Sequence, residues 1–292
     1  MDLETLIRGL TAGSIYALCG VSINILYRAT KVFNFAQGDL IMIASCTCAM
    51  LVVDLSVPFY VAALAAVLLV VMIAVLIDLV AVAPILAKSQ DSHGWVISTL
   101  AVALILENLV GNLFGPDPRP LSAPPPLSTQ MFEIGGVQVS SYQIGIIVFA
   151  VLFIGLAEVS YKTRIGKAVL AIAEDREAAR LRGIDPRRLA RYSFACCGAV
   201  AAITGILAAP LWYASLALGT TLLLKGFLVA LTGGIGSNRG AAAAGYAIGL
   251  VEAFTAASLS PGFQDAATFA ILLLILLLRP NGVFGTPVAR AV

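Results

Sequence analysis

Few of the 292 residues are charged, and only one is a histidine. Charged side chains make up 12% of the chain, where a water-soluble domain carries about 25%. Nucleic-acid binding needs a basic soluble surface with base-reading or stacking groups; the sequence has none, so we expect no nucleic-acid partner. The single histidine, His93, gives no second ligand for a zinc site and no His-containing triad with a credible nucleophilic serine. We therefore expect no catalytic residue and no metal site.

The cysteines do not form the pattern of a disulfide framework. All five, at positions 19, 46, 48, 196 and 197, fall inside apolar runs, and their number is odd. The two adjacent cysteines would point about 100° apart on a helix, which is poor geometry for a metal chelate. We interpret all five as small packing residues.

Long apolar runs are what the sequence has in excess. Hydrophobic residues make up 60% of the chain and the mean hydropathy is +0.98, well above what one soluble core needs. A helix needs roughly 20 apolar residues to cross a bilayer, and shorter runs are typical of tilted, broken or re-entrant helices. The runs lie near residues 3–27, 40–53, 57–83, 95–114, 142–160, 192–214, 218–232, 241–257 and 265–278. We predict an all-α integral membrane protein, a polytopic bundle of about 8–9 transmembrane or partly re-entrant helices in one domain over residues 1–292.

The positions of the basic residues predict the orientation in the membrane. If residue 1 faces outward and the spans alternate, 15 of the 18 Lys and Arg fall in cytoplasmic loops. The opposite orientation would place nearly all of them outside. We therefore predict that residues 161–191 form a cytoplasmic loop and that residues 115–141 form an outer loop.

The outer loop has a distinctive composition. Residues 115–141 contain six prolines and then "FEIGGVQVS", which predicts two short strands about a Gly-Gly turn. Such a stiff loop either connects two spans or docks an external partner, and the sequence leaves both interpretations open.

A polar segment, "YRATKVFNFAQGDL", joins the first two apolar runs. Asn34 followed three residues later by Gln37 is typical of a helix cap and predicts a helix that begins near Phe35. The residues at this inner helix end are Asn34, Phe35, Gln37 and Asp39. Polar groups at membrane depth are costly unless they line water or protein. The segment is either a plain cap or the lining of a translocation pathway.

Ionisable residues also occur inside apolar runs, notably Asp78, Glu107, Lys225 and Glu252. Asp78 lies near the inner end of its run, so we expect its side chain to snorkel to the surface. Glu107 and Lys225 lie deeper and have opposite charges, which makes a buried pair between them plausible. Within "GYAIGLVEAF", two glycines stand in G-x-x-x-G spacing, which allows helices to approach closely.

The charge is concentrated at the midpoint, in "AIAEDREAARLRGIDPRR" over residues 171–188. The sequence predicts one helix from Gly166 to Arg182, with Gly183 as its C′ residue. Asp185 is a natural N-cap and Pro186 a natural first position for the next helix. Charges are spread around this short helix, whereas a helix on lipid has one apolar and one basic face. The pattern favours a helix that fits a polar groove of another protein over a solvated connector.

Four segments carry a resemblance to a known family. "EAARLRG" matches the E-A-A-x-x-x-G core of the cytoplasmic coupling loop in permease subunits of bacterial ABC importers. In order, "GLTAGSIYALCGVSINILYRATKVFNFAQGDL", "AIAEDREAARLRGI", "KGFLVALTGGIGSNRGAAAAG" and "LLLRPNGVFG" resemble the LivH-like permeases of the branched-chain amino acid transport family. The likeness runs from about residue 9 to residue 285. The I-x-L-P that follows the E-A-A motif in many importer permeases is absent, and "IDPRRLARYSFA" stands in its place.

The resemblance implies a permease subunit of an ATP-driven ABC importer in the bacterial cytoplasmic (inner) membrane. It implies a second, LivM-like permease subunit, two cytoplasmic ATPase subunits, and an extracytoplasmic binding protein that delivers branched-chain amino acids or a related small polar substrate. It places ATPase coupling at Glu174, Asp175, Arg176, Glu177, Ala178, Ala179, Arg180 and Gly183.

The nucleotide is expected outside this chain. "GGIGSNRG" lacks the Lys and Ser/Thr of a phosphate-binding P-loop, so we expect no cofactor here and ATP bound by the partner subunits. The chain is then a transporter subunit and not an enzyme. The alternative is an ion-coupled secondary transporter, which would use Glu107 and Lys225 as coupling charges but has no need of the charged midpoint.

The orientation is testable with single cysteines at Ser128 and Ala178 in a background without the five native cysteines. In intact cells, an impermeant thiol reagent should react at position 128 and not at position 178, because only the outer loop meets the reagent. Reaction at position 178 alone would reverse the orientation.

Overall fold

The computed structural model describes residues 3–88, 94–134, 137–279 and 281–285. The chain forms two compact units. The terminal unit comprises Met1–Asn24, Gln130–Glu158 and Lys225–Val292, and the central unit comprises Ile25–Thr129 and Val159–Leu224. The expectation of a single domain over residues 1–292 stays a prediction.

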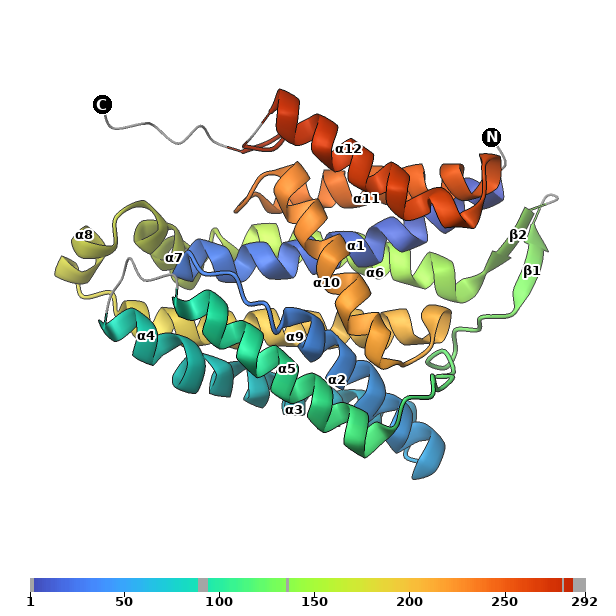
Figure 1. The fold of residues 1–292 in the computed structure, drawn as a ribbon, viewed down its shortest axis with the longest axis horizontal. Coiled ribbons are helices and arrows are strands. Elements are labelled where there is room, and N and C mark those ends of the chain that lie inside the picture. The colour runs from blue at the N-terminus through green and yellow to red at the C-terminus, as the bar shows by residue number, and fades with distance from the viewer. Residues whose placement is uncertain (1–2, 89–93, 135–136, 280, 286–292) are drawn as a thin grey trace. The chain divides into compact units, whose positions relative to one another are not determined.

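Helices account for nearly all of the described structure (Figure 1). They are α1 (Leu3–Thr30), α2 (Gln37–Ala49), α3 (Phe59–Ile77), α4 (Ala83–Lys88), α5 (Gly94–Phe114), α6 (Ser141–Ser160), α7 (Arg164–Glu174), α8 (Arg176–Leu181), α9 (Pro186–Trp212), α10 (Leu216–Gly233), α11 (Asn238–Ser258) and α12 (Gln264–Leu278). Short π-helical turns extend α2 over Met50–Asp54 and α3 over Asp78–Val82, and a 3-10 turn, Pro261–Phe263, precedes α12. Within the described ranges, nine helical stretches are long and apolar enough to span a membrane, which confirms the predicted polytopic all-α fold.

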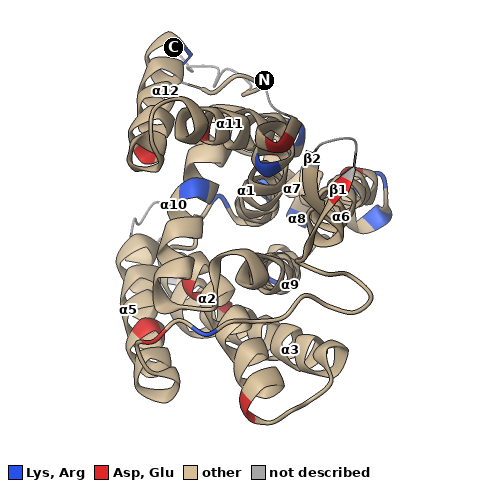
Figure 2. Cartoon of the chain, turned by 90° about the vertical axis from the view of Figure 1, so that its right-hand side faces the viewer, with Lys and Arg blue, Asp and Glu red and all other residues tan. Residues whose placement is uncertain are grey.

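In the central unit, α2, α3 and α9 pack against one another through small side chains (Figure 1). One face of α3 carries a buried stripe, Ala62, Ala66, Val70, Ala74 and Ile77, while the larger Leu64, Leu68, Met72 and Leu76 are exposed. Large apolar residues on the outside suit contact with lipid, and small ones inside let helix backbones approach. Figure 2 shows how little charge these helices carry.

Glycines on α9 mark the closest approaches. A Cβ added at Gly198 would lie 2.6 Å from the Cβ of Ala74, and one at Gly205 would overlap the carbonyl oxygen of Ile41. Both positions therefore need glycine for α9 to pack against α3 and α2.

The expected snorkelling of Asp78 is wrong. Its side chain is buried, with 3% of the residue exposed, at the start of the π-helical turn that follows α3. The side chain therefore lies within the central unit and is not exposed.

In the terminal unit, the G-x-x-x-G spacing does bring two helices together. A Cβ added at Gly245 of α11 would lie 2.6 Å from the backbone nitrogen of Ala17 on α1, and one at Gly249 would overlap the backbone of Gly13. The prediction of close helix approach is confirmed.

The predicted pair between Glu107 and Lys225 is wrong. Glu107 is an exposed residue of α5, whereas Lys225 on α10 is 5% exposed and forms ion pairs with Glu252 of α11 and, at 2.7 Å, Asp265 of α12. The sequence does not show which helices face one another or at which height, so it did not identify the partner of Lys225.

The Glu252 carboxylate accepts hydrogen bonds from three other helices. Besides the Lys225 ammonium, the Tyr16 hydroxyl of α1 donates to it at 2.7 Å and the Thr268 hydroxyl of α12 at 2.6 Å. Together with Asp265, these five residues form a cluster that we call the charge hub. A buried charge is tolerated in a membrane only when it is paired in this way.

The predicted outer loop contains the expected hairpin. β1 (Met131–Ile134) and β2 (Val137–Ser140) pair antiparallel, with Phe132 opposite Val139; the predicted Gly-Gly turn at 135–136 lies outside the described residues. Ser140 and Gln143 then form a capping box, since each side chain accepts a hydrogen bond from the other's backbone N–H.

Arg119 anchors the proline-rich part of the loop within the central unit. Its guanidinium pairs with Asp54, donates to the carbonyl of Phe114 at 3.0 Å, and lies 4.4 Å from the Phe114 ring centroid. Its backbone pairs with Ala214, between α9 and α10. The loop is fixed across several helix ends, which suits a connector; a docking role stays an open prediction.

The charge hub predicts a large loss of stability when one partner is removed. Lys225→Met leaves the Glu252 carboxylate buried without its ammonium, which should lower the free energy of unfolding by about 3–5 kcal/mol. The measurement is thermal unfolding of the purified protein in detergent.

Two further variants control this experiment. Arg8→Gln removes the exposed pair with Glu4 and should cost only about 0–1 kcal/mol. Lys225→Met combined with Glu252→Gln removes the unpaired charge and should regain most of the loss. If Lys225→Met unfolds at the same temperature as Arg8→Gln, the hub does not stabilise the unit.

Candidate functional site

The predicted cytoplasmic loop over residues 161–191 contains the charged midpoint and the helices α7 and α8. We call it the coupling segment after its predicted role. Thr163 caps α7 by accepting a hydrogen bond from the backbone N–H of Gly166 at 3.2 Å. Gly166 packs tightly, because an added Cβ would overlap the carbonyl of Ser160 and the Cα of Tyr161. The start of the segment is therefore held firmly against the end of α6.

The predicted single helix from Gly166 to Arg182 is wrong, because the chain breaks at Asp175. That residue has extended dihedral angles, φ −146° and ψ 109°, and separates α7 from α8. Its side chain accepts from the backbone N–H groups of Glu177 and Ala178, both at 2.9 Å. Aspartate competes with helix continuation by capping the helix that follows it, and propensity alone did not reveal the break.

The predicted end of α8 is confirmed at Gly183, whose φ is +82°. Its N–H donates to the carbonyl of Arg180 at 2.9 Å, and the N–H of Ile184 donates to the carbonyl of Ala179 at 3.1 Å. These two bonds are those of a Schellman motif, which needs a left-handed residue at C′. Glycine adopts that conformation without strain.

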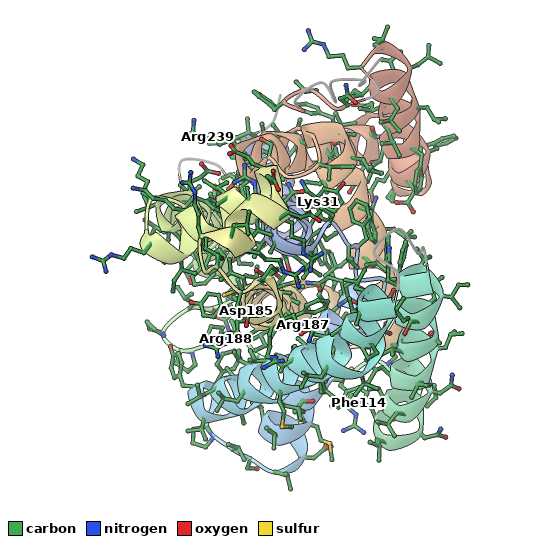
Figure 3. The ribbon with its side chains drawn as sticks, turned by 90° about the vertical axis from the view of Figure 1, so that its left-hand side faces the viewer. Lys31, Phe114, Asp185, Arg187, Arg188 and Arg239 are labelled. Atoms are coloured by element: carbon green, nitrogen blue, oxygen red, sulfur yellow. The ribbon has the colours of Figure 1, made fainter. Side chains whose placement is uncertain are left out.

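The next helix starts as the sequence predicts. Asp185 caps α9 by accepting from the N–H groups of Arg187 at 2.9 Å and Arg188 at 3.4 Å, with Pro186 at the first position. Figure 3 shows Asp185, Arg187 and Arg188 gathered at this end of α9. The turn between α8 and α9 is thus fixed by Gly183 on one side and Asp185 on the other.

One side of the coupling segment is buried and the other is exposed. Val169, Ile172 and Ala179 are buried. Of the predicted coupling residues, Glu174, Asp175, Glu177, Ala178 and Arg180 are exposed, as is Leu181 beside them. Leu181, an apolar side chain with 90% of its surface exposed, is a residue that the sequence reasoning missed. An isolated apolar tip among charges suits contact with another protein.

Arg176 lies between these two sides. It is half-buried, and its Nε has no hydrogen-bond partner among the described residues. Burial lowers the pKa of its guanidinium, and the nearby charges of Arg180 and Arg187 lower it further.

At the candidate pathway, the second helix begins two residues later than predicted. α2 starts at Gln37, and its N-cap residue, Ala36, makes no side-chain cap bond. Asn34 instead forms a turn before the helix, with its Oδ1 accepting from the N–H of Ala36 at 3.1 Å. A hydrogen bond to the backbone two residues ahead forms an Asx turn, and the sequence pattern did not distinguish this turn from a helix cap. The Nδ2 of Asn34 is buried and has no partner within the described ranges.

Gln37 connects α2 to α9. Its Nε2 donates to the carbonyl of Cys197 at 3.4 Å, and the Cys197 thiol donates to its Oε1 at 3.0 Å. Phe35 and Asp39 are half-buried. Gln37 therefore helps to hold α2 against α9, and Cys197, which the sequence showed only as a small residue, is its partner.

Aromatic rings cluster around the same segment. The ring centroids of Tyr27 and Phe33 lie 4.6 Å apart, and Trp95 lies 6.4 Å from Phe33 and 6.5 Å from Phe35. Sequence reasoning missed Trp95 and Phe33, because their contacts depend on the approach of α5 to the turn before α2.

A cation–π contact joins the coupling segment to the end of α1. The Arg28 guanidinium carbon lies 4.5 Å from the ring centroid of Tyr161. Arg28 lies six residues before Asn34, so the start of the coupling segment touches the helix that leads into the candidate pathway.

Three of the four family-like segments meet in the terminal unit. The Asn24 side chain donates to the carbonyl of Ser237 at 3.0 Å and accepts from the N–H of Gly236 at 2.8 Å. The N–H of Val283, in the segment after α12, donates to the carbonyl of Thr232 at 2.8 Å. These residues build the end of the unit where α10 ends and α11 begins.

Comparison with known proteins assigns the family. The family model described as branched-chain amino acid transport system / permease component matches residues 5–278. The chain belongs to this family. Among its relatives is BraD, a high-affinity branched-chain amino acid transport system permease protein of Pseudomonas aeruginosa, 32% identical over 98% of this chain and 96% of BraD. LivH of Escherichia coli K12, a permease protein with the same description, is 29% identical over 98% of this chain and 96% of its own length.

The fold also matches a solved structure. PsaBC from Streptococcus pneumoniae, determined in complex with a Fab, has a TM-score of 0.51 and 14% sequence identity. The match covers 97% of this chain and 93% of the PsaBC chain.

The family match and the nine candidate spans of the described residues together show that this chain is a multi-pass membrane permease, a transport protein and not an enzyme.

Proposed function

We propose that this permease forms the translocation path of an ATP-driven ABC importer in a bacterial cytoplasmic membrane. A LivM-like second permease subunit would complete the path, and two cytoplasmic ATPase subunits would bind and hydrolyse the ATP. An extracytoplasmic binding protein would deliver branched-chain amino acids or a related small polar substrate. The family match over residues 5–278 supports this function.

The coupling segment is the observation that carries the proposal. Thr163, Asp175, Gly183 and Asp185 fix its two helices by caps, while most of its charged side chains point away from the unit. Isolated surface ion pairs contribute only about 0–1 kcal/mol to folding, so fold stability does not require so much charge there. A rigid helix that presents charge and the exposed Leu181 suits a docking site for an ATPase subunit.

Helix α9 offers a route from the ATPases to the path. It begins at Pro186, directly after the coupling segment, and contacts α2 through Cys197 and Gly205. A push on the coupling segment would move α9 as a rod and shift the start of α2, where Asn34 and Asp39 lie. Such a two-state movement would change which side of the membrane the path opens to.

The ion-coupled alternative has less support. Its expected coupling charge, Lys225, is already paired with Glu252 and Asp265 inside the terminal unit. Transport by the reconstituted complex at constant ATP should continue when the proton gradient is dissipated; loss of transport under that condition would favour the alternative.

Gly183→Val tests the coupling assignment. Valine at φ +82° would cost roughly 1–2 kcal/mol of strain and redirect α8. We expect membrane insertion to stay normal while ATPase co-purification falls or ATP hydrolysis becomes uncoupled from transport. Gly155→Val is the matched control: an added Cβ at either glycine meets nothing within 4 Å, but Gly155 is an ordinary helical residue.

Glu177→Arg tests the charge at the same surface. Glu177 is exposed and makes no ion pair among the described residues, so reversal of its charge should spare the fold and weaken ATPase binding. If both Gly183→Val and Glu177→Arg retain bound ATPases and full transport, the segment is a solvated connector.

Asp39→Asn and Asn34→Leu test the pathway assignment. Asp39→Asn removes a charge and Asn34→Leu removes a polar group at the start of α2, so substrate uptake should fall while the amount of assembled complex stays constant. Asp117→Asn in the exposed outer loop is the control and should transport normally. If both test variants transport at the parental rate, the segment is only a structural turn and does not line the pathway.

A further inference from the structure

The terminal unit contains an apolar cavity of about 200 Å³. Its walls come from the end of α10, the first half of α11, the second half of α12 and the segment that follows α12. Ala243 and Ala247 of α11 and Phe284 after α12 line it and are exposed, so the cavity opens to the surface of this unit.

The lining excludes a polar ligand. No charged side chain lines the cavity, and its one hydroxyl, that of Thr232, already donates to the carbonyl of Leu228 at 2.8 Å. A zwitterionic amino acid or a water cluster would find no partners there. The cavity fits a flexible hydrocarbon instead.

The neighbouring surface of α12 is apolar and exposed. Ile271 and Ile275 line the cavity, while Leu273 and Leu277 on the same helix are 68% and 85% exposed. Exposed leucines on a spanning helix are compatible with lipid contact. An acyl chain can therefore reach the cavity directly from the bilayer.

A basic residue stands at the mouth of the cavity. The Arg279 guanidinium lies 3.5 Å from the carbonyl oxygen of Val283, a lining residue, and forms no ion pair with any described carboxylate. Arg239, adjacent to the lining residue Gly240, is already paired with Glu158 at 3.1 Å. Arg279 is thus available for an anion at the end of the membrane that the basic residues mark as cytoplasmic.

We propose that this cavity binds one acyl chain of an anionic phospholipid from the cytoplasmic leaflet, with its phosphate on Arg279. Basic residues beside apolar surface between transmembrane helices are suited to such headgroups. The bound lipid would fill the space between α11 and α12 and tie the segment after α12 to both helices. The proposal needs only membrane insertion and does not depend on the transported substrate.

Native mass spectrometry of the full-length permease, purified and stripped of lipid, tests the proposal. Dioleoyl phosphatidylglycerol and dioleoyl phosphatidylcholine differ in headgroup charge and not in chains, so they separate the two parts of the site. The parental protein should bind its first molecule of phosphatidylglycerol more tightly than its first molecule of phosphatidylcholine. Arg279→Gln should lose that preference while keeping the affinity for phosphatidylcholine.

Filling the cavity tests the acyl-chain part. Ala247→Phe would exclude several methylene groups, so the affinity for both lipids should fall at least about tenfold. Ala257→Phe, at an exposed alanine of α11 outside the cavity, is the control and should bind as the parent does. Ala243→Leu is the second cavity-filling variant, to be used if Ala247→Phe does not fold.

Three results would overturn the proposal. The first is equal affinity of the parental protein for the two lipids, and the second is unchanged lipid affinity in the folded cavity-filling variants. The third is a cavity-filling variant that keeps its lipid but no longer co-purifies with a second permease subunit, which would make the cavity a protein interface.

Discussion

The terminal unit depends on one buried carboxylate. Glu252 accepts hydrogen bonds from α1, α10 and α12, and so links three helices to α11 at membrane depth. A carboxylate in that environment costs several kcal/mol unless its lone pairs are occupied, and here three donors occupy them. Because the Lys225 ammonium also bridges to Asp265, the charge is satisfied within the unit and is not free to couple an external ion. The same network therefore favours a structural role over secondary transport.

Many of the other helix contacts use small residues instead of charge. Gly13 and Gly249 let α1 and α11 touch, and Gly198 and Gly205 do the same for α9. Helices in lipid gain little from burying apolar side chains, so close backbone contact and dispersion must hold them together. Small residues permit that contact, while large side chains such as Leu68 are exposed, which suits contact with lipid. Close contacts between small residues thus act beside the charge hub and beside uncharged polar contacts such as that of Gln37 with Cys197.

Features that depend on neighbouring residues could be predicted from the sequence, whereas contacts between distant segments could not. Span positions follow from run length, and the turn at Gly183 and Asp185 follows from residue preferences that act within a few positions. The break at Asp175 was missed because one aspartate competed with a run of good helix formers. The partner of Lys225 was mistaken for Glu107 because charge and depth do not determine which helix faces which. For the same reason, the Gln37 contact with Cys197 had no signal in the sequence.

Contacts of α9 and of Tyr161 connect the coupling segment to the helices on either side of the turn that contains Asn34. A cap at Asp185 fixes the start of α9, and the tight packing of Gly205 against Ile41 fixes that helix to α2 further along. A second connection runs through Arg28, whose guanidinium lies on the ring of Tyr161. The two connections reach both sides of the turn that contains Asn34. In the proposed mechanism, a displacement of the coupling segment would therefore act on that turn from α1 and from α2 together, and could shift it between two positions.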